Sequence, residues 1–193
     1  MIYGLAVLMV SMAACKRTLP AKVLTSTVQA SNGWWVSLKH GSVIVDTVFF
    51  MNTYNTSANT GDSLWLDDIG TLNNAILNQW TEANQGGQAG GNIPLFYYYG
   101  IGLSSFKAKV ALQYSALTFS APTGSENEYW TGDTSSSASI SVFNGKILLG
   151  ASHSNPSGAA SDSINFQIVY SKSPLDTFVV AGVSRTGFDE DEQ

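Results

Sequence analysis

Hydrolysis through a serine nucleophile requires a histidine base held against that serine, and the chain has only two histidines, His40 and His153. His40 lies in a predicted turn, and His153 lies in a loop rich in Ser, Asn, Pro and Gly. No Gly-x-Ser-x-Gly elbow is present. The pairs Asp62-Ser63 and Asp162-Ser163 each precede an apolar strand, but adjacent residues on a strand point to opposite faces. We therefore expect no catalytic residues, and we interpret each Asp as a residue that ties the turn before its strand.

Cys15 is the only cysteine, so an internal disulfide cannot form. It follows the apolar stretch Ile2–Ala14, which is too short to cross a hydrocarbon core of about 30 Å as a helix and is typical of an export signal. Small residues directly before a cysteine resemble the lipobox of bacterial lipoproteins, in which that cysteine carries the acyl chains. The resemblance implies a signal peptide over 1–14, lipid attachment at Cys15, a polar tether over 15–30, and a lipoprotein of the outer membrane, on its periplasmic side or on the cell surface. The stretch before Cys15 lacks Lys and Arg, so a plain signal peptide or a buried N-terminal strand remains an alternative.

Metal, cofactor and nucleic-acid sites are not expected. Two isolated histidines do not make a zinc site, and no glycine-rich phosphate loop opens a helix, so we predict no cofactor. Asp67-Asp68 and the run Asp189–Glu192 could bind calcium loosely, but we favour solvated carboxylates at both places. The net charge is −5, and the same acidic run supplies four of these charges, so we interpret residues 189–193 as a disordered acidic tail. No basic stripe favours nucleic acid.

The rest of the chain is typical of an all-β protein. Only 12% of its residues are charged, which suits half-buried strands with polar, uncharged outer faces. Five apolar residues alternate along Phe106–Ser115, which is strong evidence for a strand, and Asn144-Gly145 predicts a type I′ hairpin turn. The predicted strands are Gly33–Lys39, Val43–Asn52, Asp62–Asp68, Phe106–Ser115, Ser139–Phe143, Lys146–Gly150, Asp162–Tyr170 and Phe178–Arg185.

Eight antiparallel strands can close into a barrel that removes exposed edges, and an open two-sheet sandwich is the alternative. We therefore predict an antiparallel, about eight-stranded, calycin- or lipocalin-like barrel domain over residues 31–188. Gly70–Leu103 does not fit the strand pattern and forms an insertion, with a short helix predicted over Leu72–Thr81. The aromatic run Phe96–Tyr99 could cover a barrel mouth, contact a partner or pack on the barrel wall.

Three segments carry a resemblance to a known family. They read TYNTSANTGDSLWLDD (Thr53–Asp68), NGKILLGASHSNPSGAASDSINF (Asn144–Phe166) and VAGVSRTGF (Val180–Phe188). Together they resemble the bacterial lipoproteins called "lipid-binding putative hydrolases", and the resemblance implies a cell-envelope protein with a calycin-like β-barrel. A weaker likeness to lipocalins, through Gly33-Trp34-Trp35 and Arg185, implies a structural contact of Arg185 with Trp35.

A barrel of this size holds either packed side chains or one small ligand. Five aromatic residues could line such an interior and give it polar tips: Tyr54, Trp65, Tyr114, Phe166 and Tyr170. Our leading hypothesis is a lipoprotein that binds an apolar or amphipathic small molecule without chemistry. A lipid or ester hydrolase is one alternative. An accessory subunit with a filled barrel, bound to an envelope protein partner, is the other.

Overall fold

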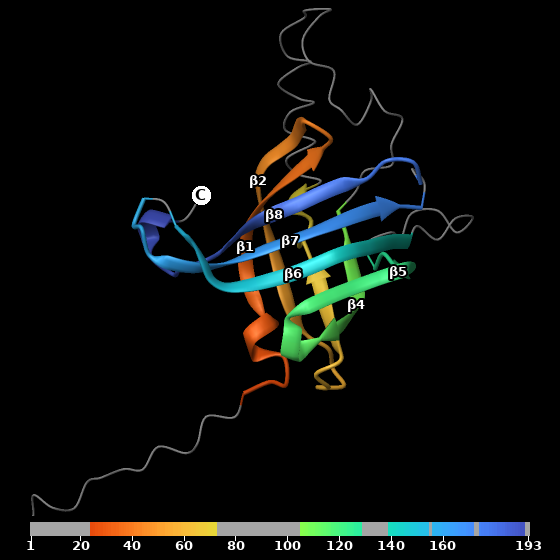
Figure 1. Ribbon diagram of the computed structural model, residues 1–193, viewed down its shortest axis with the longest axis horizontal. Coiled ribbons are helices and arrows are strands. Elements are labelled where there is room, and N and C mark those ends of the chain that lie inside the picture. The colour runs from red at the N-terminus through yellow and green to blue at the C-terminus, as the bar shows by residue number, and fades with distance from the viewer. Residues whose placement is uncertain (1–23, 73–104, 129–138, 155, 172–173, 192–193) are drawn as a thin grey trace, which may run out of the picture.

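The computed structural model describes residues 24–72, 105–128, 139–154, 156–171 and 174–191. Eight antiparallel strands pair in sequence order, and the last strand pairs with the first, so the predicted closed barrel is confirmed (Figure 1). The strands are β1 (Asn32–His40), β2 (Val43–Asn55), β3 (Ser63–Asp67), β4 (Lys107–Gln113), β5 (Thr118–Glu126), β6 (Ser139–His153), β7 (Ala160–Tyr170) and β8 (Phe178–Ser184). Among the residues described, three 3-10 helices flank them: η2 (Val28–Ala30), η3 (Tyr114–Ala116) and η4 (Asp189–Asp191).

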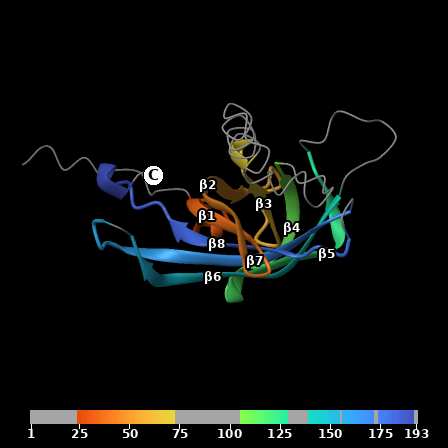
Figure 2. The same ribbon diagram turned by 90° about the horizontal axis from the view of Figure 1, so that it is seen from above.

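The barrel is flattened, with β2 and β3 on one side and β6 and β7 on the other (Figure 2). Alternation along the strands decides which side chains face inward. Trp34, Val36 and Leu38 of β1 are buried, as are Ala108, Val110 and Leu112 of β4. Tyr114 leaves this pattern because it begins η3 instead of continuing the predicted strand, and it is only half-buried.

The predicted hairpin at Asn144-Gly145 is wrong. Residues 139–153 form one long strand, β6, and the pairing of β6 with β7 shifts register between Phe143 and Lys146. Asn144 has a φ of +54°, so this residue forms a bulge inside the strand instead of a turn. A Cβ at Gly145 would collide with the ring of Phe119, which is why glycine follows it.

The predicted strand list also lacks β5. Its sequence contains Pro122 and Gly124, which interrupt the alternation, and its pairing with β6 shifts register around both residues. The predicted number of strands is therefore right, although one predicted pair is a single strand and one observed strand was missed.

The two ends of the barrel differ. At the end we call the closed end, short connections of seven and four residues join β2 to β3 and β4 to β5, and η2 packs against the barrel. At the other end, which we call the loop end, β1 connects to β2, β3 to β4, β5 to β6, and β7 to β8. The predicted helix over Leu72–Thr81 and the aromatic run Phe96–Tyr99 belong to the β3–β4 connection, and residues 73–104 lie outside the described residues.

The chain before β1 is fixed to the closed end. Thr27 Oγ1 donates a hydrogen bond to Asn55 Oδ1 (3.1 Å), and Ser26 N donates one to Asn59 Oδ1 (3.0 Å). Thr53 Oγ1 accepts hydrogen bonds from Asn32 N and from Trp34 Nε1 at 3.1 and 2.8 Å. Residues 24–30 are therefore part of the barrel's closed end, and they are not a loose tether. The predicted signal peptide, Cys15 and the first part of the tether lie outside the described residues.

The C-terminal segment is ordered as well. β6 and β7 extend beyond the barrel as a two-stranded ribbon toward η4 (Figure 1). Asp191 of η4 is buried and accepts hydrogen bonds from Ser157 N and Oγ and from Thr186 Oγ1. The prediction of a disordered acidic tail is therefore wrong for Asp189–Asp191, because this carboxylate holds the turn between β6 and β7. No helix of the described residues is long and apolar enough to cross a membrane.

Candidate functional site

The closed half of the barrel interior is densely packed. Trp34, Met51 and Leu64 have no exposed surface, and Trp34 Nε1 finds its partner in Thr53. Toward the middle of the barrel, the ring of Phe166 packs edge-on against Phe119 at 5.6 Å between centroids. A side chain facing a cavity large enough for water would retain accessible surface. These side chains therefore leave no room for a ligand between them.

The inward rows of side chains become polar at the loop end. His40 continues the inward alternation of β1, and Tyr170 ends that of β7. Asp68 follows Leu64 and Leu66 and directly succeeds β3. Asp46 of β2 is paired with Leu38, so it faces the same side of the sheet as that buried leucine. Four titratable side chains thus occupy inward positions in the loop half, whereas the inward side chains of the closed half are mainly apolar and include the hydroxyl of Thr53.

Asp68 is the most deeply buried of these groups, with no exposed surface. Its Oδ1 accepts hydrogen bonds from Phe106 N (3.2 Å) and Gly70 N (3.1 Å). Its Oδ2 is buried and has no hydrogen-bond partner among the described residues. Burial raises the pKa of Asp68 to about 6, because the loss of water outweighs the hydrogen bonds from the backbone amides of Gly70, Phe106 and Leu72 and from the Ser105 side chain.

Tyr170 and Asp46 have similar surroundings. Burial raises the pKa of the Tyr170 hydroxyl well above its usual range, and the nearby charge of Asp68 acts in the same direction. Asp46 is 4% exposed, and its Oδ2 is a second buried carboxylate oxygen without a hydrogen-bond partner. Burial raises the pKa of Asp46, against the effect of backbone hydrogen bonds from Val48 and Thr47.

At the rim of the loop end, His40 Nε2 lies 3.1 Å from Asp176 Oδ1. The imidazole ring also packs on Phe178, with 5.1 Å between centroids, and Phe178 packs edge-on against Tyr170 at 6.0 Å. Asp176 and Phe178 therefore fix the orientation of the His40 ring at the rim of the loop end. The other histidine, His153, lies on the ribbon, where its Nδ1 donates to the carbonyl of Gly158.

The five predicted ligand residues do not come together. Phe166 and Tyr170 face the interior, and Tyr114 is at the closed end, where its hydroxyl accepts a hydrogen bond from Gln29 N. Tyr54 and Trp65 are paired across β2 and β3 and lie on the outer face. There the Tyr54 hydroxyl donates to Asp67 Oδ2 (2.7 Å), and Lys107 Nζ lies 5.1 Å from the centroid of the Trp65 ring.

Asp68 and Asp46 were not predicted as site residues. We expected Asp67-Asp68 to be solvated, but both carboxylates are buried and they face opposite sides of the sheet. The alternation of Leu64, Leu66 and Asp68 contains the signal, since it assigns Asp68 to the inward face. Asp46 lacks such a signal, because register shifts between β1 and β2 change which residues of β2 face inward.

The predicted structural residues Trp35 and Arg185 lie on the outer face of the barrel. The Arg185 guanidinium lies 5.4 Å from the centroid of Phe50, and Phe50 packs edge-on against Trp35 at 5.2 Å. Phe50 therefore stands beside both residues of the predicted pair. The tryptophan that faces the interior is its neighbour Trp34.

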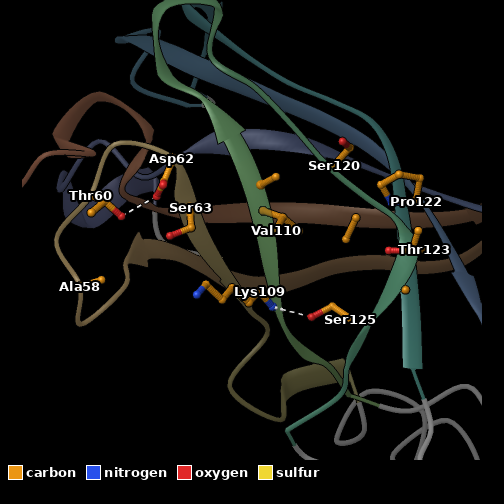
Figure 3. A pocket seen from close by; sticks show the side chains of 13 residues that line it. Ala58, Thr60, Asp62, Ser63, Lys109, Val110, Ser120, Pro122, Thr123 and Ser125 are labelled. Carbon is orange, nitrogen blue, oxygen red and sulfur yellow. Dashed lines mark hydrogen bonds between the residues drawn. The ribbon is translucent and has the colours of Figure 1, made fainter.

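An open groove of about 670 Å³ crosses the outer wall over β3, β4 and β5 (Figure 3). Asp62, Lys109 and Ser125 lie along it, and Ser125 Oγ accepts a hydrogen bond from Lys109 N (3.1 Å). A hydrogen bond from Thr60 lowers the pKa of Asp62, and the charge of Lys109 acts in the same direction, so Asp62 is a poor general base. The groove is shallow and lined by small polar side chains, unlike a site for an apolar chain.

No three His, Cys, Asp or Glu side chains gather into a metal site within the described part of the chain. The sequence model of a family described as "Lipid-binding putative hydrolase" matches residues 20–189, which include every described strand. A comparison with curated proteins finds no match.

Proposed function

Because the chain belongs to the lipid-binding putative hydrolase family, we propose that its barrel binds an amphipathic, lipid-like molecule at the loop end and performs no chemistry on it. The proposal rests on the distribution of the inward side chains, which are mainly apolar in the closed half and include the titratable residues Asp46, Asp68 and Tyr170 in the loop half. An amphipathic molecule needs both kinds of surface side by side.

The packed closed half restricts where the ligand binds. Phe106 and Phe178 of the loop half are buried as well, so these aromatic side chains would have to move apart for the ligand's apolar part to enter beside the carboxyl and hydroxyl groups there. Exposed aliphatic side chains on the outer side of the same end, Val43, Ile44, Val48 and Ile69, extend the apolar surface beyond the interior. The complex would be held by burial of apolar area and oriented by a few hydrogen bonds.

The proposal includes an anchor in the cell envelope, with acyl chains on Cys15 in the outer membrane. Nine residue steps separate Cys15 from Leu24, which allows a reach of about 30 Å for an extended chain. Since residues 24–30 bind to the closed end, the loop end would point away from the anchoring leaflet. Cys15→Ser should release the protein from the membrane fraction, and retention of this variant in the membrane would contradict the anchor.

Two other functions each have an observation in their favour. The packed closed half suits an accessory subunit whose barrel is filled and whose exposed loop-end side chains contact a protein partner. In a hydrolase site, His40 would be the base and Asp176 would orient it. Such a site would also need a nucleophile within hydrogen-bond reach of His40. Hydrolysis of a short ester by the wild-type protein, lost in His40→Ala, would favour the second of these.

Native mass spectrometry of the protein beginning at Lys16, purified from cells and followed by organic extraction, tests the binding proposal. We expect a bound species of defined mass with an alkyl chain and a polar head. Thr123→Trp serves as the control, because Thr123 lines the outer groove and a bulky residue there should leave the bound species in place. A ligand-free mass from the wild-type protein would favour the filled accessory barrel.

A further inference from the structure

We propose that the outer groove is a second binding site, and that it takes an extended, uncharged oligosaccharide. This site is separate from the proposed lipid site, because the groove lies on the outer face of the barrel wall and is open to solvent (Figure 3). The shape of the groove, the chemistry of its side chains and the pairing of its backbone point to this ligand class.

The groove follows a row of small side chains that crosses the strands. Ser63 of β3 is paired with Ala111 of β4, and Ala111 is paired with Ser120 of β5. A second open hollow, of about 610 Å³, shares Ala111 and Ser120 with the groove and continues it toward Asn144 of β6. Because neighbouring strands lie about 4.8 Å apart, the way from β3 to β6 is about 14 Å, which suits a chain of a few sugar rings.

Longer side chains border this row on both sides. Lys109 lies two residues before Ala111 and Gln113 lies two residues after it, so all three point to the same face of β4. Lys109 and Gln113 are exposed, and each lines one of the two hollows. The row of small residues is therefore a floor between two raised edges.

The side chains along this floor both donate and accept hydrogen bonds. Asp62 supplies a carboxylate, Lys109 and Lys146 supply ammonium groups, and Gln113 supplies an amide. Hydroxyl groups come from Thr60, Ser63, Ser120, Thr123 and Ser125. A sugar hydroxyl is donor and acceptor at once, so it matches all of these groups. A polyanion would meet the carboxylate and a polycation would meet the two ammonium groups, which favours an uncharged chain.

An aromatic surface adjoins the groove. Tyr54 and Trp65 are paired across β2 and β3 on the outer face, and both are half-buried. Trp65 is in turn paired with Lys109, which lines the groove. The C–H face of a sugar ring packs well on an aromatic side chain, so a ring that leaves the groove at Lys109 would find an apolar contact there.

The backbone of β4 argues against a peptide as the ligand. Lys109 N donates to Ser125 Oγ (3.1 Å). Lys107 N donates to Asn127 Oδ1 (3.0 Å). An added peptide strand needs a row of unpaired backbone groups, and these two amides of β4 are already bound to side chains.

Amide NMR shifts of the protein beginning at Lys16 test the assignment. Cellohexaose and chitohexaose are the uncharged, extended probes, and hexagalacturonate is an anionic probe of the same length. We expect at least one uncharged probe to shift the signals of Thr60–Ser63, Lys109–Ala111 and Ser120–Ser125 with a Kd below about 5 mM. Hexagalacturonate should bind more weakly than that probe.

Two variants should block the groove. Ala111→Phe places a ring on the floor, and Thr123→Trp places one at an exposed position of the edge, so each should weaken binding at least about tenfold. Ala181→Phe is the matched control, since it makes the same change on the outer face of β8, on the opposite side of the closed barrel. Thermal unfolding verifies that all three variants are folded.

Shifts in the groove that both blocking variants weaken and Ala181→Phe preserves support the assignment. Absence of shifts with both uncharged probes overturns it, as do shifts elsewhere or unchanged affinity in the folded Ala111→Phe and Thr123→Trp variants. Tighter binding of hexagalacturonate overturns the uncharged ligand class. Lipid binding is measured separately by the organic extract, so its failure would leave this site in place.

Discussion

At the scale of single residues, two buried polar side chains, Thr53 and Asp68, differ in how completely their polar atoms are hydrogen-bonded. Thr53 is fully satisfied: it accepts from Trp34 Nε1 and Asn32 N, and it donates to the carbonyl of Ala30 (2.5 Å). Asp68 keeps one buried oxygen without a partner in the described structure. The first arrangement stabilises the closed end, and the second costs stability at the loop end.

The raised pKa of Asp68 predicts how stability changes with pH. A carboxyl whose pKa is about 6 in the folded protein and 3.8 otherwise favours folding when protonated. Its ionisation should therefore reduce the free energy of unfolding as the pH rises from about 4 to 6, by at most about 3 kcal/mol. Asp68→Asn should raise the stability at pH 7.5 by about 1–3 kcal/mol and flatten this part of the profile. Melting temperatures between pH 4 and 8 measure both effects, and an Asp68→Asn variant less stable than wild type at pH 7.5 would contradict the prediction.

Thr53→Val should destabilise the protein by about 2–4 kcal/mol, because it leaves two buried donors and one carbonyl without their partner. Thr53→Ser keeps the hydroxyl and removes only a methyl group, so its loss should be about 1 kcal/mol. Chemical denaturation of the two variants provides the comparison. Equal losses would mean that packing of the methyl group, and not the hydrogen bonds, fixes η2 and Trp34 to the closed end.

At the scale of elements, β6 is the strand that the sequence describes least well. Asn-Gly is the strongest short signal for a hairpin, yet here the strand continues through it as a bulge. The difference arises from long-range packing, since the ring of Phe119 on β5 occupies the place of a Cβ at Gly145. A local turn signal contains no information about a ring on a neighbouring strand. By contrast, the clean alternation of β4 and β7 predicted both strands and their buried faces.

Gly145→Ala should therefore be costly, by about 2–3 kcal/mol, because the new methyl group displaces the Phe119 ring from its packing against Phe166. Gly61→Ala is the matched control: its Cβ would lie 3.8 Å from the nearest atom, so the change should stay within about 0.5 kcal/mol of wild type. Urea denaturation of the two variants tests this. A Gly145→Ala protein as stable as Gly61→Ala would show that Phe119 can move aside freely.

The ribbon of β6 and β7 depends on the C-terminal segment through Asp191. Burial opposes ionisation of Asp191, but the hydrogen bonds from Ser157 and Thr186 outweigh it and lower its pKa. The stabilisation it gives is therefore present above the ordinary pKa of an aspartate and is lost as the pH falls. Asp191→Ala should speed amide hydrogen exchange at Ser157, whereas Asp189→Ala, an exposed residue of the same helix, should not. Unchanged exchange at Ser157 in Asp191→Ala would show that the turn is held without this carboxylate.

At the scale of the whole molecule, the closed barrel follows from the sequence, while the character of its interior does not. Eight amphipathic strands and the three family-like segments predicted the fold. The aromatic residues predicted as a ligand set are divided between the interior, the outer wall and the closed end, because composition alone does not assign a strand's face near a bulge or at its ends. The polar loop half is not evident from the sequence, because the inward positions of Asp46 in β2, of Asp68 directly after β3 and of Tyr170 in β7 depend on how the strands pair.

Binding of an amphipathic ligand at the loop end is tested most directly by the shifts of amide NMR signals on addition of octylamine. We predict that the shifts concentrate at His40–Val43, Asp68–Thr71 and Tyr170–Phe178, with little change at Val28–Asn32 or along the outer groove at Ser120–Ser125. Shifts confined to the outer groove or the closed end would contradict the claim, and so would a spectrum that octylamine leaves unchanged.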